Sequence, residues 1–416
     1  MISVDTDFFS LLFITICSIC VLFVIGINKK LQFRNLILLG FLLRIFLMIA
    51  DYYHWFPIPN SGVDSENFHK IALENQKSLV WRASSNYTYF LTYIYNITNS
   101  SRLIAQYINV LFGLGVMIFV QRSLFLLEIN RSIQKRAMWV VVLLPNLIIF
   151  SGILLREAWV EFFAAASLFY FIRWFRNGSK MNMILAFAMV VIAAIMHSGI
   201  IGLLMGYILA FLIYNPKKQR VHFSGSSIVA LILLAGIMTL FLNYSGIFAS
   251  KIEIYNFDDP DTLIEITNRI NAGGSDYLTW LKADNVALSL LLTPLKIFYF
   301  LFSPLPTEWR GISDIIGFCV DGAVYLWLCI GIFRSKCSRG FGKLLKTFLA
   351  TSMLVTVFIF AYGTSNAGTA FRHRAKIMPL IIVAYAASLN YSTNSQKKLF
   401  KKIRYTKRNF IPEESQ

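Results

Sequence analysis

A run of basic residues near the C-terminus is the clearest chemical feature of the sequence. Arg372, His373, Arg374 and Lys376 come directly before the apolar segment 377–390. Arginine keeps its charge at ordinary pH, and its planar fork of N–H donors matches two oxygens of a phosphate group. The run therefore predicts a binding site for an anionic phosphate. The simpler alternative is that these side chains reach out to lipid headgroups.

Carboxylates that could act beside such a ligand lie in two other segments. Asp64 and Glu66 belong to the stretch SGVDSENFHKIALENQ, and Glu157 follows Arg156 in LLREAWVEF. A carboxylate can accept a proton from a hydroxyl group where water is scarce. Two structural roles are also open: Asp64 as the cap of the following helix, and Arg156–Glu157 as an ion pair at the end of a span.

His197 and Arg310 complete the set of candidate site residues. His197 lies in MHSG, which joins two apolar segments, and Arg310 lies in SPLPTEWRGISD. Ionisable residues cost about 2.5–3.5 kcal/mol each at the centre of a bilayer, so those in or beside spans are candidates for function. For His197 the structural alternative is a buried, hydrogen-bonded position at a kink. Arg44, inside an apolar segment, is expected to stabilise the helix bundle.

The composition indicates a membrane protein. The 416 residues are 57% hydrophobic and 14% charged, with a mean hydropathy of +0.62, whereas soluble chains are roughly 25% charged. The net charge of +18 falls mainly in short loops and a tail, so membrane lipid is an expected partner and nucleic acid is not. The five cysteines show neither a disulfide framework nor metal-ligand spacing. We therefore predict an all-α, polytopic transmembrane helical bundle.

Apolar runs approaching the ~20 residues needed to cross a bilayer recur along the chain. The predicted spans, about 11 in number, are 8–27, 36–50, 103–120, 138–155, 158–172, 183–196, 200–214, 227–242, 312–333, 348–362 and 377–390. The apolar stretch 286–302 contains Pro294 and Lys296, and as a span it would reverse the side of everything after it. We interpret it as a re-entrant or interfacial segment.

Lys and Arg set the predicted sidedness. The short loops 28–35, 121–137, 173–181, 215–222 and 334–346 are basic and therefore cytoplasmic. This gives one integral membrane domain over 1–416 with the C-terminus cytoplasmic. Its parts are a first external loop with amphipathic helices (51–102), a second external region with the re-entrant segment (243–311) and a basic cytoplasmic tail (392–416). The run Arg372–Lys376 is then external, where cations are disfavoured, and an anionic ligand there would explain it.

The order of these features resembles the GT-C superfamily of membrane glycosyltransferases, which use polyprenyl-phosphate-linked sugars. The resemblance covers roughly 36–214 and 363–390, and includes Wzy-type surface-polysaccharide polymerases. Its motifs are an acidic first loop, a span ending in Pro, Ser and an acid, and a basic motif opening the last span. The matching residues are Asp64, Phe68 and Ala72; Pro145, Ser151 and Glu157; and Arg372, Arg374 and Pro379. Departures are Phe68 in place of the usual Tyr, Arg156 before the acid, and an additional first span.

The resemblance implies a reaction and roles for these residues. The chain would join undecaprenyl-linked glycan units at the outer face of the bacterial inner (plasma) membrane, as an O-antigen or capsule polymerase in lipopolysaccharide or other surface-polysaccharide assembly. Asp64 would be the general base. Arg372, Arg374 and Lys376 would bind the phosphate or pyrophosphate of the donor, and Glu66 or Glu157 would position the acceptor or the cations.

The partners implied are the polyprenyl-(pyro)phosphate-linked glycan and other proteins of polysaccharide assembly. No cofactor is assigned; a divalent metal stays open, although the first loop lacks the second adjacent acid of a metal site. Two other functions remain alternatives. One is a GT-C enzyme that adds a single sugar from a polyprenyl-monophosphate donor, and the other is a flippase or transporter of lipid-linked oligosaccharides.

Overall fold

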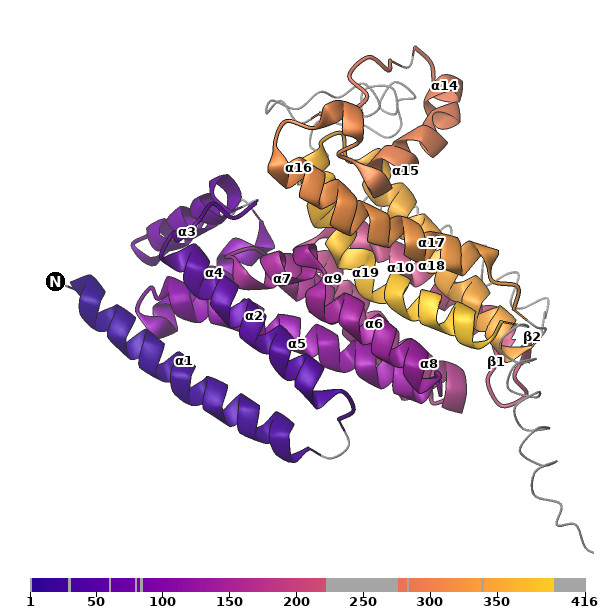
Figure 1. The fold of residues 1–416 in the computed structure, drawn as a ribbon, viewed down its shortest axis with the longest axis horizontal. Helices are drawn as coiled ribbons and strands as arrows, with labels where there is room; N and C mark the ends of the chain where they lie inside the picture. Colours follow the sequence, from indigo (N-terminus) through magenta and orange to yellow (C-terminus); the bar gives the residue numbers. More distant parts are fainter. Residues whose placement is uncertain are drawn as a thin grey trace, which may run out of the picture.

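The protein is a bundle of long helices (Figure 1). The computed structural model describes residues 2–28, 31–59, 61–78, 81–82, 85–221, 276–282, 284–337 and 340–392. In this part of the chain the secondary structure is helical apart from a two-stranded antiparallel ribbon and two isolated bridges. The predicted all-α class is therefore confirmed.

The helices of the N-terminal half run from the first residues to the short ribbon. They are α1 (Ile2–Ile27), α2 (Arg34–Tyr52), α3 (Val63–Gln76), α4 (Asn86–Thr98), α5 (Arg102–Leu126), α6 (Arg131–Leu143), α7 (Pro145–Gly152), α8 (Glu157–Asn177), α9 (Lys180–Met196), the 3-10 turn η1 (Ser198–Gly202) and α10 (Leu203–Ile213). The ribbon pairs β1 (Tyr214–Asn215) with β2 (Arg220–Val221).

The described part of the C-terminal half starts at residue 276. Its elements are α14 (Val286–Leu291), α15 (Thr293–Phe302), the 3-10 turn η2 (Pro306–Glu308), α16 (Ile312–Ile316), the π-helical turn η3 (Gly317–Gly322), α17 (Ala323–Arg334), α18 (Phe341–Tyr362) and α19 (Ala367–Asn390).

Six described helices are long and apolar enough to cross a membrane. They are Asp7–Ile27, Arg34–Tyr52, Arg102–Leu126, Glu157–Asn177, Asp314–Arg334 and Phe341–Tyr362. This supports the predicted membrane protein with transmembrane helices, but the number is smaller than the eleven spans expected. The predicted span 227–242 lies outside the described residues.

The remaining predicted spans differ from single long helices for identifiable reasons. The predicted span 138–155 is broken, because Pro145 has no N–H and cannot continue α6; α6 and α7 meet at a bend of 46°. The predicted spans 183–196 and 200–214 correspond to shorter apolar helices, α9 and η1–α10. The stretch 286–302 forms two short helices, α14 and α15, and its re-entrant or interfacial position stays a prediction.

The helix α19 is the centre of the bundle. Every residue from His373 to Ser388 is buried, and α19 packs against α18, α8, α17 and α6, with which it runs side by side in Figure 1. The predicted span 377–390 is only its second half. The helix begins at Ala367, where the Asn366 side chain accepts a hydrogen bond from the Thr369 N–H at 3.1 Å. The basic run is therefore part of a buried helix instead of a loop that precedes it.

Candidate functional site

Arg372 joins three helices through carboxylates. Its Nη2 donates to Glu157 Oε1 at 2.9 Å, and its Nε donates to the same oxygen at 3.2 Å. Its Nη1 donates to the carboxylate of Asp64. Lys376, one turn further along α19, lies 3.4 Å from Glu157 Oε1. Residues four apart share one helix face, so α19 presents two cations to acids from α3 and α8.

The two acids lie at helix N-termini, where negative charge is favourable. Glu157 is the first residue of α8 and Asp64 is in the first turn of α3. The N-cap of α3 is Gly62, so the capping role considered for Asp64 is wrong. Glu157 is 1% exposed, whereas the Asp64 side chain is 48% exposed. One carboxylate thus neutralises buried cations and the other is open to a ligand.

Arg156 adds a third cation to this group. Its charge interacts with those of Glu157, Arg372 and Asp64, and burial lowers its pKa while Glu157 opposes that shift. Its buried Nε has no hydrogen-bond partner among the described residues. The expected Arg156–Glu157 pair is replaced, because Glu157 forms its ion pairs with Arg372 and Lys376. Asp64, Arg156, Glu157, Arg372 and Lys376, here called the Arg372 cluster, carry one excess positive charge.

A second group of charged residues lies one turn further along α8 from Glu157. Glu161, four residues after Glu157 on α8, is 1% exposed, and Arg44 of α2 is 0% exposed. Glu161 interacts electrostatically with Arg44 and Lys376. Arg44 donates to the Gly40 carbonyl at 2.9 Å and to the Val141 carbonyl at 3.4 Å. The contact with Val141 joins α2 to α6, in agreement with the bundle-stabilising role expected for Arg44.

Glu66 lies apart from Arg372 and pairs with Arg102. Arg102 Nη1 is 2.5 Å from Glu66 Oε1, and its Nη2 is 3.8 Å from Asp51. Gln106 Nε2 donates to Asp51 at 2.6 Å, and Ser61 donates to the same side chain. This network links α3 to α2 and α5, and so positions Asp64. Arg102 was missed in the sequence, although a cation in the first turn of a helix opposes the helix dipole and signals a specific partner.

His197 and His373 meet beside the Arg372 cluster. Their ring centroids are 4.6 Å apart, and His373 Nδ1 is 3.1 Å from Thr364 Oγ1. His197 lies at the junction of α9 and η1, which is the kink position considered for it. Phe360 contacts both imidazoles, with centroid distances of 5.4 and 4.9 Å. The histidine pair therefore borders the cluster through Phe360, whose ring centroid lies 5.8 Å from Lys376 Nζ.

Arg374 points away from this group. Two residues along an α-helix correspond to a rotation of roughly 200°, so Arg374 lies on the face of α19 opposite Arg372. Its Nη1 donates to the Leu301 carbonyl at 2.7 Å, and its guanidinium lies 5.6 Å from the Tyr325 ring centroid. The basic run is therefore two sites instead of one.

Arg310 is separate as well. Its side chain is 49% exposed, and its Nε is 3.6 Å from Asp314. It lines a pocket of about 260 Å³, here called the Arg310 pocket, with Asp276, Pro304, Thr307, Glu308, Trp309 and Ala367. Burial raises the pKa of Glu308, while the Leu305 N–H and Arg310 oppose that shift.

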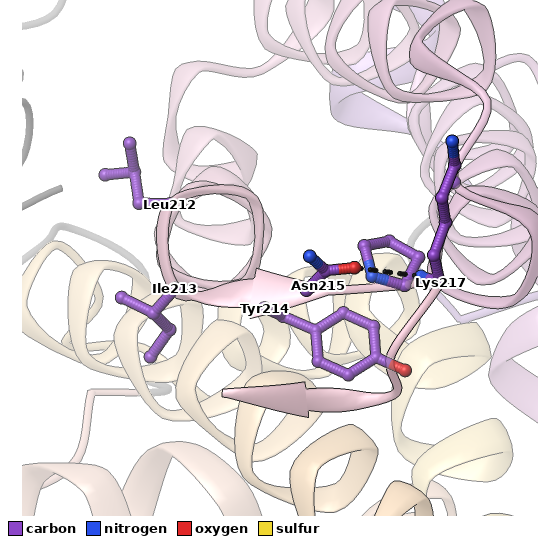
Figure 2. A pocket seen from close by; sticks show the side chains of 7 residues that line it. Leu212, Ile213, Tyr214, Asn215 and Lys217 are labelled. Atoms are coloured by element: carbon purple, nitrogen blue, oxygen red, sulfur yellow. Dashed lines mark hydrogen bonds between the residues drawn. The ribbon is translucent and has the colours of Figure 1, made fainter. Parts of the chain in front are cut away.

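A second pocket, of about 300 Å³, lies where α10 runs into β1 (Figure 2). Its lining is Gly178 and residues 212–217, and the Lys217 N–H donates to Asn215 Oδ1 at 3.1 Å. It contains none of the candidate residues and no carboxylate. We therefore assign it no part in the candidate site.

Metal binding gains no support from the geometry. Among the residues that the structure describes, no three His, Cys, Asp or Glu side chains form a group that could hold a metal ion. All five cysteines are free thiols.

Comparison of the chain with models of known protein families, with curated proteins and with solved structures finds no match. The functional interpretation therefore depends on the residues and their geometry.

Proposed function

We propose that this chain is a membrane glycosyltransferase of GT-C type that joins undecaprenyl-linked glycan units during O-antigen or capsule assembly. The observation that carries the proposal is the Arg372 cluster. It combines a half-exposed carboxylate, Asp64, with largely buried cations, and the cations outnumber the carboxylates by one charge. A base for a hydroxyl group and a binding site for a phosphate thus lie side by side, which is what this reaction requires.

In the proposed reaction an acceptor hydroxyl attacks the anomeric carbon of the donor sugar. The new C–O bond forms as the bond between that carbon and the phosphate oxygen breaks, and the electron pair remains on the phosphate. Asp64 takes the proton of the hydroxyl. Arg372, Lys376 and Arg156 stabilise the negative charge that develops on the leaving polyprenyl (pyro)phosphate. The products are an extended glycan and the released lipid carrier.

The contact between Arg372 and Asp64 adds a binding step to this mechanism. A phosphate oxygen that approaches Arg372 competes with the Asp64 carboxylate for the same Nη1 donor. Release of Asp64 from Arg372 leaves its carboxylate free to accept a proton. Glu157 stays in place, because it keeps Lys376 at 3.4 Å.

The proposed location is the outer face of the bacterial inner membrane, with the C-terminus cytoplasmic. The support is the distribution of Lys and Arg among the loops. In this topology α3 and the start of α19 face outward, and the lipid tail of the substrate lies between helices.

The decisive variant is Asp64→Asn, which keeps the size of the side chain and removes the base. We expect loss of glycan polymer, seen as disappearance of the ladder on a gel, with protein level and membrane insertion unchanged. The matched control is Asp314→Asn, which removes an acid that pairs with Arg310 outside the cluster. A normal ladder from Asp64→Asn would remove this residue from catalysis.

The alternative transferase adds one sugar from a monophosphate carrier and uses the same cluster. Product length separates the two reactions, because a polymerase makes a ladder and a single-sugar enzyme makes one band. A lipid-linked oligosaccharide transporter is the second alternative. It is favoured by the deeper charges Glu161 and Arg44, which continue the line of ionisable side chains into the bundle. A dead transporter leaves lipid-linked units inside the cell, whereas a dead polymerase leaves single units outside.

A further inference from the structure

The face of α19 opposite the Arg372 cluster carries a second arginine with unused donors. Arg374 is 0% exposed, and its Nη1 is bound to the Leu301 carbonyl. Its Nε and Nη2 have no hydrogen-bond partner among the described residues. These two atoms form one edge of the guanidinium, which binds two oxygens of a carboxylate or phosphate at once. Buried polar groups in folded proteins are nearly always hydrogen-bonded, so this edge indicates a ligand.

Three other buried polar atoms also have no hydrogen-bond partner in the described part of the chain, and their residues are linked to Arg374 through Leu301, through Tyr325 or by charge. They are Ser303 Oγ, Asn146 Oδ1 and Asp321 Oδ1. Asn146 Nδ2 donates to the Tyr325 hydroxyl at 3.1 Å, and the Tyr325 ring lies under Arg374. The atoms come from α7, from the residues after α15, and from η3. Several elements therefore converge on one polar group inside the bundle.

Asp321 is the acidic residue whose negative charge acts on Arg374. The two interact electrostatically, and the Asp321 carboxylate accepts the backbone N–H of Asn146. Asp321 belongs to the π-helical turn η3. Such turns are rare in proteins overall, and many of those that occur lie at functional sites. Asp321 is thus held near Arg374 without occupying its free edge.

The Arg310 pocket opens on the same face of α19. Ala367, which lines this pocket, precedes Arg374 by seven residues, which is two turns and roughly 10 Å along the axis. Pro304 in the pocket follows Ser303. The carboxylates Asp276 and Glu308 in the pocket disfavour a bare anion there, but they can accept hydrogen bonds from hydroxyl groups.

We propose that Arg374 and Ser303 form a second binding site, for the anionic group of a polyhydroxylated ligand such as a sugar carboxylate or sugar phosphate. The Arg374 edge holds the carboxylate or phosphate, and the Arg310 pocket holds hydroxyl groups of the same ligand. Asp321 competes for Arg374 and weakens binding. This site is independent of glycosyl transfer at the Arg372 cluster.

The test is a binding titration on the purified full chain in detergent, with glucuronate, glucose 6-phosphate, inorganic phosphate and glucose as probes. We expect at least one sugar anion to bind at least tenfold more tightly than glucose and than inorganic phosphate; whether it is the glucuronate or the phosphate identifies the group. Loss of a charge-assisted fork typically weakens binding about tenfold or more. Arg374→Gln and Arg374→Lys should therefore both reduce affinity, because lysine keeps the charge but not the fork.

Two further variants complete the test. Asp321→Asn removes the competing acid and should increase affinity for the sugar anion. Arg176→Gln should leave it unchanged, because that side chain pairs with Glu128 outside both proposed sites. Unchanged affinity in Arg374→Lys with a native elution profile, loss of affinity in Arg176→Gln, or equal binding of glucose would each overturn the proposal. Failure of this site leaves the Asp64→Asn experiment untouched, so the two proposals are tested separately.

Discussion

At the scale of single residues, the cluster depends on the Glu157 carboxylate, which forms ion pairs with two cations. Glu157 is 1% exposed and lies 2.9 Å from Arg372 Nη2 and 3.4 Å from Lys376 Nζ. Asp64 binds the same arginine, but its side chain is 48% exposed. Water screens an exposed pair, whereas the partners of a buried pair depend on each other. The two acids should therefore respond differently to removal of their charge.

We predict that Glu157→Gln destabilises the protein by about 3–5 kcal/mol, because it leaves buried cations without a counter-charge. Asp64→Asn should cost at most about 1 kcal/mol. Thermal unfolding in one detergent, followed by circular dichroism, measures both, with Asp314→Asn as a control outside the cluster. Equal stability of the two variants would show that Glu157 does not hold these cations.

At the scale of elements, the position of α3 decides whether Asp64 reaches Arg372. Arg102 holds α3 through Glu66. His69 on α3 lies 2.5 Å from the Tyr95 hydroxyl of α4 through its Nδ1, and Asn86 of α4 donates to the Ile195 carbonyl of α9 at 2.8 Å. The pair α3–α4 is therefore fastened to the bundle by polar contacts, in addition to the packing of Tyr87 and Phe90 on Trp159.

The packing of α3 on α4 should depend on pH. Burial lowers the pKa of His69, Arg102 lowers it further, and Glu66 opposes both. The folded state thus favours the neutral imidazole. This contribution to stability is complete above the unfolded pKa of about 6.5 and is lost as the pH falls towards the lower folded value.

Hydrogen exchange measures this effect. We expect amides of 63–76 to exchange faster at pH 5 than at pH 7.5, after correction for intrinsic rates, while amides of the central helix α19 stay protected. In His69→Gln the difference between the two pH values should disappear. Persistence of the full pH effect in that variant would assign it to another group.

At the scale of the whole molecule, charge placement predicts the orientation in the membrane. His54 lies between α2 and α3, and Lys218 lies between β1 and β2; both side chains are exposed. We expect a cysteine at 54, in a chain whose native cysteines are replaced by serine, to react with an impermeant maleimide in intact cells. A cysteine at 218 should react only after the membrane is opened. The reverse pattern would place Asp64 in the cytoplasm and exclude a lipid-linked donor at the outer face.

The membrane class and most long helices could be predicted, because length and hydrophobicity are local properties. The predicted starts of α2, α5 and α8 are within two residues of the observed ones. Among the described residues, fewer helices than expected are long enough to span, for a physical reason: an apolar run marks burial from water, and a helix such as α9 can be buried without being long enough to span. The first half of α19 was missed as helix because its cations lower its hydropathy.

The sequence alone determined that cations and carboxylates lie at the ends of apolar helices, since hydrophobicity and charge are properties of the residues themselves. Only the structure showed that residues 367–376 are helical, so that Arg372 and Lys376 share a face. Only the tertiary structure decided that Glu157 and Asp64 meet Arg372 and that Arg374 faces Leu301, because these contacts join residues up to 308 positions apart. Such pairings follow from how helices pack around α19, and no local pattern specifies that packing.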